Sequence, residues 1–325
     1  MNLIETNVRK LDLWQQRHRF SAFTYAVFKK FGDDQAGNHV ALLTYFAFIS
    51  TFPLLLALSA ILGLVLRGHP SLVASVQTSA LAEFPIIGTQ LRSQIGLTSL
   101  GHSAPALIVG ILGAILGGRG LANALQNTQN TLWNVPKVDR PGFPTNYLRS
   151  FGLLVLLGIG TIVTTAAASL VGAGHTLGLT GAPLKALAYA LSIVIGIGLF
   201  LAAFRIAASR IIPTRELVLG AILSSVVWQI LLSLAGIIIS HDLKHAQAIA
   251  GFFGVVLGLL AWFGLQATAI VYAIEADVVR AHHLWPRSII QPPLTKADKA
   301  FLVETANAEK RLPEQRITVE FSGTC

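Results

Sequence analysis

Long apolar runs alternate with short polar segments along the chain. Six stretches contain no Asp, Glu, Lys or Arg, at positions 35–66, 93–118, 150–184, 186–204, 217–241 and 245–274. Each stretch can hold the ~17 to 25 residues that a membrane-spanning helix requires. The pattern therefore predicts an all-α, polytopic membrane protein, a bundle of six transmembrane helices near residues 40–66, 104–125, 150–171, 183–204, 217–239 and 249–275.

The basic residues are distributed unevenly among the loops that these helices leave. When alternate segments are grouped, twenty Lys and Arg residues fall on one side and four on the other. Loops rich in Lys and Arg resist translocation and stay in the cytoplasm. We therefore predict that both termini are cytoplasmic, which agrees with an even number of spans.

Composition supports a membrane protein and narrows its chemistry. Of the 325 residues, 53% are hydrophobic and 12% are charged, whereas soluble domains carry about 25% charged residues. The net charge of +9 would also suit nucleic acid, but positive cytoplasmic loops account for it, so we expect no nucleic-acid partner. Cys325 is the single cysteine, which excludes an intrachain disulfide and a cysteine-built metal site. We expect no cofactor and no metal.

The pattern divides the chain into three parts. Residues 1–38 carry apolar stripes flanked by Arg and Lys, as in a helix lying against anionic lipid headgroups at the cytoplasmic face. A solvated helix that packs on the loops explains these stripes equally well. Residues 39–276 form the transmembrane domain. Residues 277–325 form a polar, proline-containing cytoplasmic tail that we expect to be largely disordered, apart from a short helix capped by Thr295 and Asp298.

Polar residues in the first span are candidates for a substrate path, because polar groups are costly inside hydrocarbon. Pro53 removes a backbone donor, so we expect a kink near it. Thr44 and Thr51 are seven residues apart and share a helix face. They either line a path or bond to the backbone of their own helix, and the sequence leaves both interpretations open.

The second span ends in glycines, an arginine and a row of amides. Gly113 and Gly117 form a GxxxG face that allows close approach of another helix. Arg119 follows at the end of the span, where it either binds an anion or extends to the interface. An amide face follows at spacings of four and three: Asn123, Asn127 and Asn130.

Acidic residues and glutamines are scarce in the apolar regions, so we consider each one. Asp33 and Asp34 precede the first span, where an acidic side chain can cap a helix. Glu275 closes the sixth span, where we expect it to pair with an arginine. Gln229 and Gln266 lie deep in the fifth and sixth spans. They either bond to each other between helices or contact a substrate.

These segments together resemble the YihY/BrkB family of bacterial inner-membrane proteins, which has long carried the name ribonuclease BN. The resemblance covers roughly residues 20–280. It is based on ALLTYFAFISTFPLLLALSAILG in the first span, GGRGLANALQNTQNTLWNVP after the second and FFGVVLGLLAWFGLQATAIVYAIEA in the sixth. Residues matching the family's recurring positions are Tyr45, Pro53, Arg119, Asn127, Trp133, Gly254 and Glu275.

The resemblance implies an inner-membrane bundle of six helices with both termini inside. Our main hypothesis for its function is a transporter or exporter of a polar or anionic small molecule or a lipid-like substrate. The alternatives are a membrane-bound ribonuclease and an envelope scaffold that transports nothing. The ribonuclease hypothesis is chemically weaker, because phosphodiester hydrolysis usually needs clustered metal ligands or a positioned acid and base.

Overall fold

The computed structural model describes residues 3–65, 104–176 and 181–321. Within these ranges the chain is helical and contains no strand. The segment between the first two predicted spans lies mostly outside them. The principal helices are α1 (Leu3–Arg17), α2 (Arg19–Asp33), α3 (Ala36–Val65), α7 (Ala104–Leu132), α8 (Thr145–Thr176), α9 (Ala182–Ala207), α10 (Val218–Ala281) and α11 (Lys296–Ala308), with short 3-10 helices η1 (Lys137–Asp139) and η2 (Thr214–Leu217).

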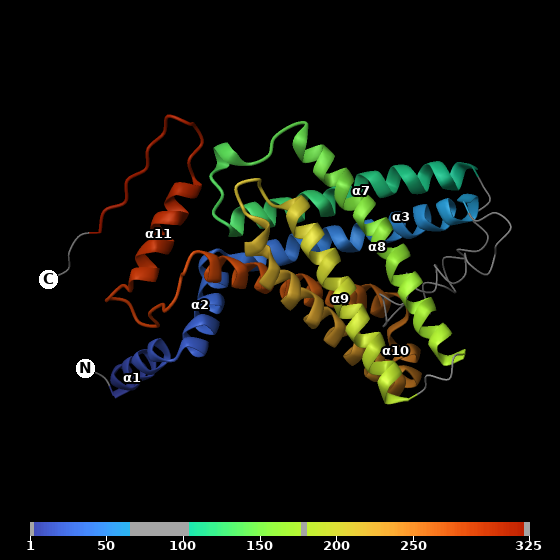
Figure 1. The fold of residues 1–325 in the computed structure, drawn as a ribbon, viewed down its shortest axis with the longest axis horizontal. Helices are drawn as coiled ribbons and strands as arrows, with labels where there is room; N and C mark the ends of the chain where they lie inside the picture. The colour runs from blue at the N-terminus through green and yellow to red at the C-terminus, as the bar shows by residue number, and fades with distance from the viewer. Residues whose placement is uncertain (1–2, 66–103, 177–180, 322–325) are drawn as a thin grey trace.

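α3 and α7 run side by side and form the most extensive helix pair (Figure 1). The predicted glycine face lies at this contact. A Cβ at Gly113 would come within 2.9 Å of Pro53 Cβ, and one at Gly117 within 3.1 Å of Ser50 Cα. Small residues therefore let the two backbones approach closely, and the prediction from GxxxG is confirmed.

α10 bends back on itself. It contains 64 residues, so a straight helix would be about 96 Å long. Its two ends nevertheless lie side by side (Figure 1). A hydrogen bond from Gly220 N to Asp277 Oδ1, at 2.7 Å, joins them. A side chain at Gly220 would collide with the Asp277 carboxylate. This one element thus contains the fifth and sixth predicted spans.

Within the residues that the structure describes, four helical segments are long and apolar enough to cross a membrane. They are Thr145–Thr164, Pro183–Ala207, Thr214–Leu234 and Val256–Ala281. Large apolar side chains on them point outward, for example Phe151, Ile162 and Val194. Exposed apolar faces of this extent are typical of a surface covered by lipid. Six spans and cytoplasmic termini stay predictions.

The two ends of the described chain gather at one end of the molecule, where α1, α2 and α11 lie (Figure 1). The predicted N-terminal helix is two helices, separated at His18, whose backbone is extended. α2 packs against α10 and buries Ala22, Ala26 and Lys30. Contact of residues 1–38 with lipid headgroups stays a prediction.

The tail differs from the expected disorder. It is described to Phe321, and Phe301 of α11 belongs to the main hydrophobic core. The capping box of Thr295 and Asp298 is confirmed, with Thr295 Oγ1 accepting from Asp298 N at 3.1 Å. Composition alone missed the buried contacts that order this segment.

Candidate functional site

A buried lysine joins four segments at the end of the bundle. Lys30 of α2 is fully buried. Its Nζ donates to Glu275 Oε2 of α10 at 2.8 Å and to the carbonyl of Leu132, the last residue of α7, also at 2.8 Å. The third bond goes to Asp34, in the turn between α2 and α3. All three N–H donors of the ammonium group are therefore used. We call these four residues the Lys30 cluster.

The Lys30 cluster is electrostatically demanding. Burial by itself lowers the pKa of Lys30, but the carboxylates of Glu275 and Asp34 outweigh burial and hold the pKa above its ordinary value. Glu275 is also fully buried, and its Oε1 has no hydrogen-bond partner among the described residues. Removing two charges from water costs several kcal/mol per ion unless their geometry is good. The charged groups of the cluster are therefore stable in the interior only while the surrounding helices hold them in this geometry.

A second ion network, which we call the Asp298 network, ties the tail to α2. Arg287 Nε donates to Asp298 Oδ1 at 2.9 Å, and its Nη2 pairs with Asp33 Oδ2 at 2.9 Å. Lys29 Nζ reaches Asp298 Oδ1 at 3.1 Å. Burial raises the pKa of Asp298, but hydrogen bonds from Ser288, Thr295 and Arg287 outweigh burial and hold the pKa well below its ordinary value.

The adjacent lysines and adjacent aspartates thus serve different networks. Lys30 and Asp34 face the bundle, whereas Lys29 and Asp33 face the tail. Successive helical residues point about 100° apart, so neighbours in sequence reach different partners. The two aspartates pair with cations, although a capping role was expected for them.

The prediction that Glu275 pairs with an arginine is wrong, because its carboxylate pairs with Lys30. Arg149 instead donates to the carbonyl of Ala208, and Arg205 to that of Ile212. One signal in the sequence pointed to Lys30, since it falls on the same face of α2 as Ala22 and Ala26. A lysine on an apolar helix face requires a buried partner.

Arg119 and the amide face are divided between exposed and buried positions. Arg119 is exposed, and its guanidinium lies over the Tyr147 ring at 4.0 Å. Asn123 is exposed and accepts a bond from Asn146 Nδ2 at 3.1 Å; Asn127 is also exposed. Asn130 is buried, and its Oδ1 accepts from Ser209 N at 3.1 Å. Asn130 thus positions the loop after α9.

Glutamines on the neighbouring face of α7 are the buried amides that sequence reasoning missed. Gln126 Nε2 donates to Ser150 Oγ of α8 at 2.9 Å. Gln129 is fully buried, and both of its amide atoms lack a hydrogen-bond partner within the described part of the chain. Gln129 precedes Leu132 by three residues, a rise of about 4.5 Å along α7, so an unpaired amide lies slightly less than one helical turn deeper than the Lys30 cluster.

The polar residues of the first span bond mainly to their own helix. Thr44 Oγ1 donates to Val40 O at 2.8 Å and Thr51 Oγ1 to Ala47 O at 2.7 Å. α3 continues through Pro53, and Tyr45 is more than half exposed. For both threonines the backbone-bonding alternative is therefore observed.

Gln229 and Gln266 do not bond to each other. Gln266 is buried, and its Nε2 has no partner among the residues that the structure describes. Gln229 is half-buried. Gln266, like Gln129, is therefore a buried amide that could still take up a hydrogen bond.

Comparison with known proteins is consistent with this architecture. Residues 27–294 match the family model described as virulence factor BrkB. The chain belongs to the BrkB family. The matched range begins within α2 and ends before Asp298, so it contains the whole Lys30 cluster but not Asp298.

Among the BrkB relatives is the inner membrane protein YhjD of Escherichia coli (strain K12). It is 26% identical over 266 residues, covering 76% of this chain and 77% of that protein. Together with the apolar helices, this relative points to an inner-membrane protein. No solved structure gives a significant match.

Proposed function

We propose that the protein is a transporter of a polar or anionic solute, or of a lipid-like molecule, and that the Lys30 cluster is its gate. The supporting observation is a buried cation bonded to segments from α2, α7 and α10 and to the turn before α3. Such a cluster has two states, bonded and broken, and breaking its bonds would release all of these segments at the same time. A scaffold could use apolar residues there at lower cost.

The gate would lie at the predicted cytoplasmic end, with unpaired amides behind it. Gln129 and Gln266 are buried donors and acceptors with unused capacity, and buried polar groups in a membrane bundle are candidates for a substrate path. In this proposal the solute reaches these amides when the Lys30 cluster opens.

A non-transporting scaffold is the second candidate, and one observation favours it. α3 and α7 pack through glycines, with Gly117 against Ser50 and Gly120 against the Phe46 ring. Such close contact leaves no room for a solute between these two helices. A path would have to run between other helices.

The ribonuclease alternative has less support in the geometry. Asp33 and Asp34 pair with Arg287 and Lys30, and Glu275 also pairs with Lys30. Carboxylates held in ion pairs are poor candidates for an acid and base poised for catalysis. If the protein cuts RNA, Asp33→Asn should abolish cutting by highly purified protein.

Flux measurement in proteoliposomes tests the proposal. The panel should contain organic anions, neutral polar solutes and a short-chain fluorescent lipid. We expect at least one to cross, and Glu275→Gln, which keeps the shape but removes the charge, to change its flux about tenfold, equivalent to about 1.4 kcal/mol. Glu314→Gln makes the same change at an exposed tail position and should leave flux unchanged. Absence of flux across the panel, with tightly copurifying lipid, would favour the scaffold.

A further inference from the structure

The first helix of the chain carries its polar residues inward and its apolar residues outward. Asp12 and Gln15 of α1 are buried, with 8% and 4% of their surface exposed. Asp12 Oδ1 accepts a hydrogen bond from Ile289 N of the tail at 3.1 Å. Leu13 and Trp14, in contrast, are each more than half exposed. A helix in contact with water normally presents the opposite arrangement, so the outward apolar face of α1 indicates contact with something other than water.

The aromatic residues of α2 extend this exposed surface. Phe20 is 85% exposed, and Phe28 is 57% exposed. They lie on the same side of α2, because eight residues complete little more than two helical turns. α1 and α2 together extend outward from the end of the bundle (Figure 1), and we call them the N-terminal arm.

The contacts of α2 show which side of the helix faces the spans. The Phe28 ring meets the Tyr272 ring edge-on, with centroids 5.2 Å apart. Tyr272 lies within Val256–Ala281, one of the segments apolar enough to cross a membrane. Lys29, about 100° further around the helix, instead bonds to Asp298 of the tail. The aromatic side of α2 is therefore directed toward the apolar spans, and its basic side toward the tail.

Basic side chains lie among the exposed apolar ones on the N-terminal arm. Between positions 7 and 20 the exposed charged residues are Arg9, Lys10, Arg17 and Arg19. The single acidic residue of this stretch is Asp12, which is buried. The exposed surface of the stretch is therefore positively charged. Lys and Arg beside exposed Trp and Phe are typical of a helix that lies in the interface of a membrane with anionic lipids.

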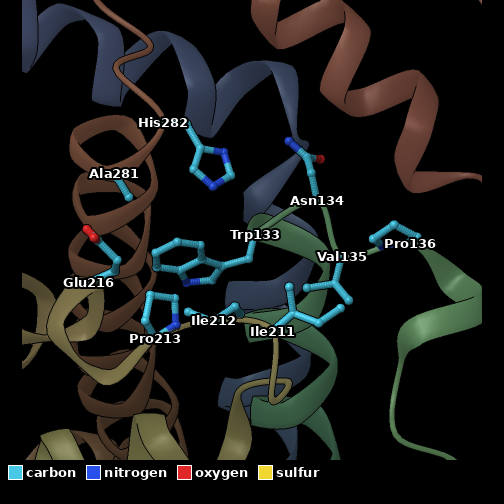
Figure 2. A pocket seen from close by; sticks show the side chains of 10 residues that line it. All are labelled: Trp133, Asn134, Val135, Pro136, Ile211, Ile212, Pro213, Glu216, Ala281 and His282. Atoms are coloured by element: carbon cyan, nitrogen blue, oxygen red, sulfur yellow. The ribbon is translucent and has the colours of Figure 1, made fainter.

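This surface is separate from a cavity of about 380 Å³ that lies beside the end of α7 (Figure 2). The residues that line the cavity come from the turn after α7, the loop at 211–216 and the end of α10, and none comes from α1 or α2. The N-terminal arm instead presents an open helix face. An open face of mixed apolar and basic residues suits an extended surface such as a bilayer.

We infer that the N-terminal arm lies on the bilayer surface and binds the phosphate groups of anionic phospholipids. Arg17 and Arg19 contact the headgroups, and Trp14 and Phe20 enter the layer just below them. A second copy of the chain is a poorer match, because the chain has a net charge of +9 and would present the same basic arm. The inference does not depend on the proposed transport function. It nevertheless reaches the proposed gate, because α2 also carries Lys30.

A fluorescent reporter on the full chain tests this inference. Cys325 is the single cysteine, so Cys325→Ser gives a background in which Asn7→Cys carries one NBD label. Asn7 is exposed on the same face of α1 as Leu11 and Trp14, and it is not one of the proposed contacts. Nanodiscs that hold a single protein chain contain nitroxide-labelled phosphatidylcholine as the quencher. Their bilayer is either phosphatidylcholine alone or equal parts of phosphatidylcholine and phosphatidylglycerol.

We expect the label to be quenched more strongly in the anionic discs. Arg17→Gln combined with Arg19→Gln removes two cations, each worth about a fivefold change in binding to an anionic surface, so the ratio of docked to undocked arm should fall about 25-fold. Lys296→Gln combined with Arg311→Gln removes two exposed cations of the tail and should leave the quenching unchanged. A label at Glu314→Cys, in the exposed tail, should be quenched equally weakly in both bilayers.

A second pair of variants tests the apolar part of the contact. Trp14→Ser combined with Phe20→Ser should also reduce quenching in the anionic discs, whereas Leu312→Ser, at an exposed tail position, should not. All these positions are exposed, so circular dichroism should stay that of the wild type. Three results would overturn the inference: equal quenching of the Asn7→Cys label in the two bilayers, unchanged quenching in the arginine variants, or protection of the label only when two chains share a disc, which would assign the surface to a second copy.

Discussion

Replacing Lys30 with methionine tests the Lys30 cluster more directly than any other single change. Methionine keeps an unbranched chain of similar length but removes the charge and all three hydrogen bonds. The carboxylates of Asp34 and Glu275 would then be buried without a cation, and the carbonyl of Leu132 would lose its donor. The substitution should therefore destabilise the contact between α2 and the bundle.

The expected loss can be worked out from the geometry. At a separation of 2.8 Å and an effective dielectric constant of about 20, the attraction between Lys30 and Glu275 is about 6 kcal/mol. Desolvation offsets much of this attraction, and breaking one partner of a buried pair typically costs about 3 to 5 kcal/mol. We expect Lys30→Met to lower the free energy of unfolding by about that amount.

Titration with SDS in mixed micelles, followed by tryptophan fluorescence, measures this free energy. A double-mutant cycle with Glu275→Gln isolates the pair, because the second substitution removes the carboxylate that the first leaves unpaired. The combined loss should be smaller than the sum of the single losses by at least about 1 kcal/mol. Lys185→Met, at an exposed position in α9, should change stability by less than about 0.5 kcal/mol.

Two results would refute this reasoning. If the free energy of unfolding of Lys30→Met lies within about 1 kcal/mol of the wild-type value, the cluster contributes little to stability. It then cannot act as a gate. If the two substitutions are additive, Lys30 and Glu275 are not coupled, and the bond between them does not hold α2 to α10.

Three further predictions concern packing, pH and topology. Gly117→Ala places a Cβ 3.1 Å from Ser50 Cα and should cost about 1 to 3 kcal/mol in the same titration, whereas Gly32→Ala, with open space around it, should cost less. The pKa of Asp298 is depressed in the folded state, so its stabilisation is complete above the ordinary value of 3.8 and is lost as pH falls below it. Proteolysis of the tail should accelerate over that range, and Asp298→Asn should accelerate it already at neutral pH; an unchanged rate in both cases would contradict the network. Reporter fusions should place both termini in the cytoplasm, and opposite locations would contradict the six-span prediction.

Several features of the fold were determined by local sequence. The apolar runs fixed where helices form, because backbone groups in lipid must bond within their own segment. Gly113 and Gly117 identified the face that α3 contacts, and Thr295 and Asp298 identified the start of α11. Each of these depends on residues within a few positions of one another, so spacing along the chain is sufficient to predict it.

The candidate site, in contrast, was decided by tertiary structure. Lys30 and Glu275 are 245 positions apart. The apolar face of α2 indicates that Lys30 is buried, but no local pattern identifies Glu275 as its partner. The same limit explains why Gln129 was overlooked and why the tail was expected to be disordered. Which polar side chains become buried depends on how α2 and the tail fold back onto α7 and α10. That folding depends on contacts between residues that are distant in the sequence.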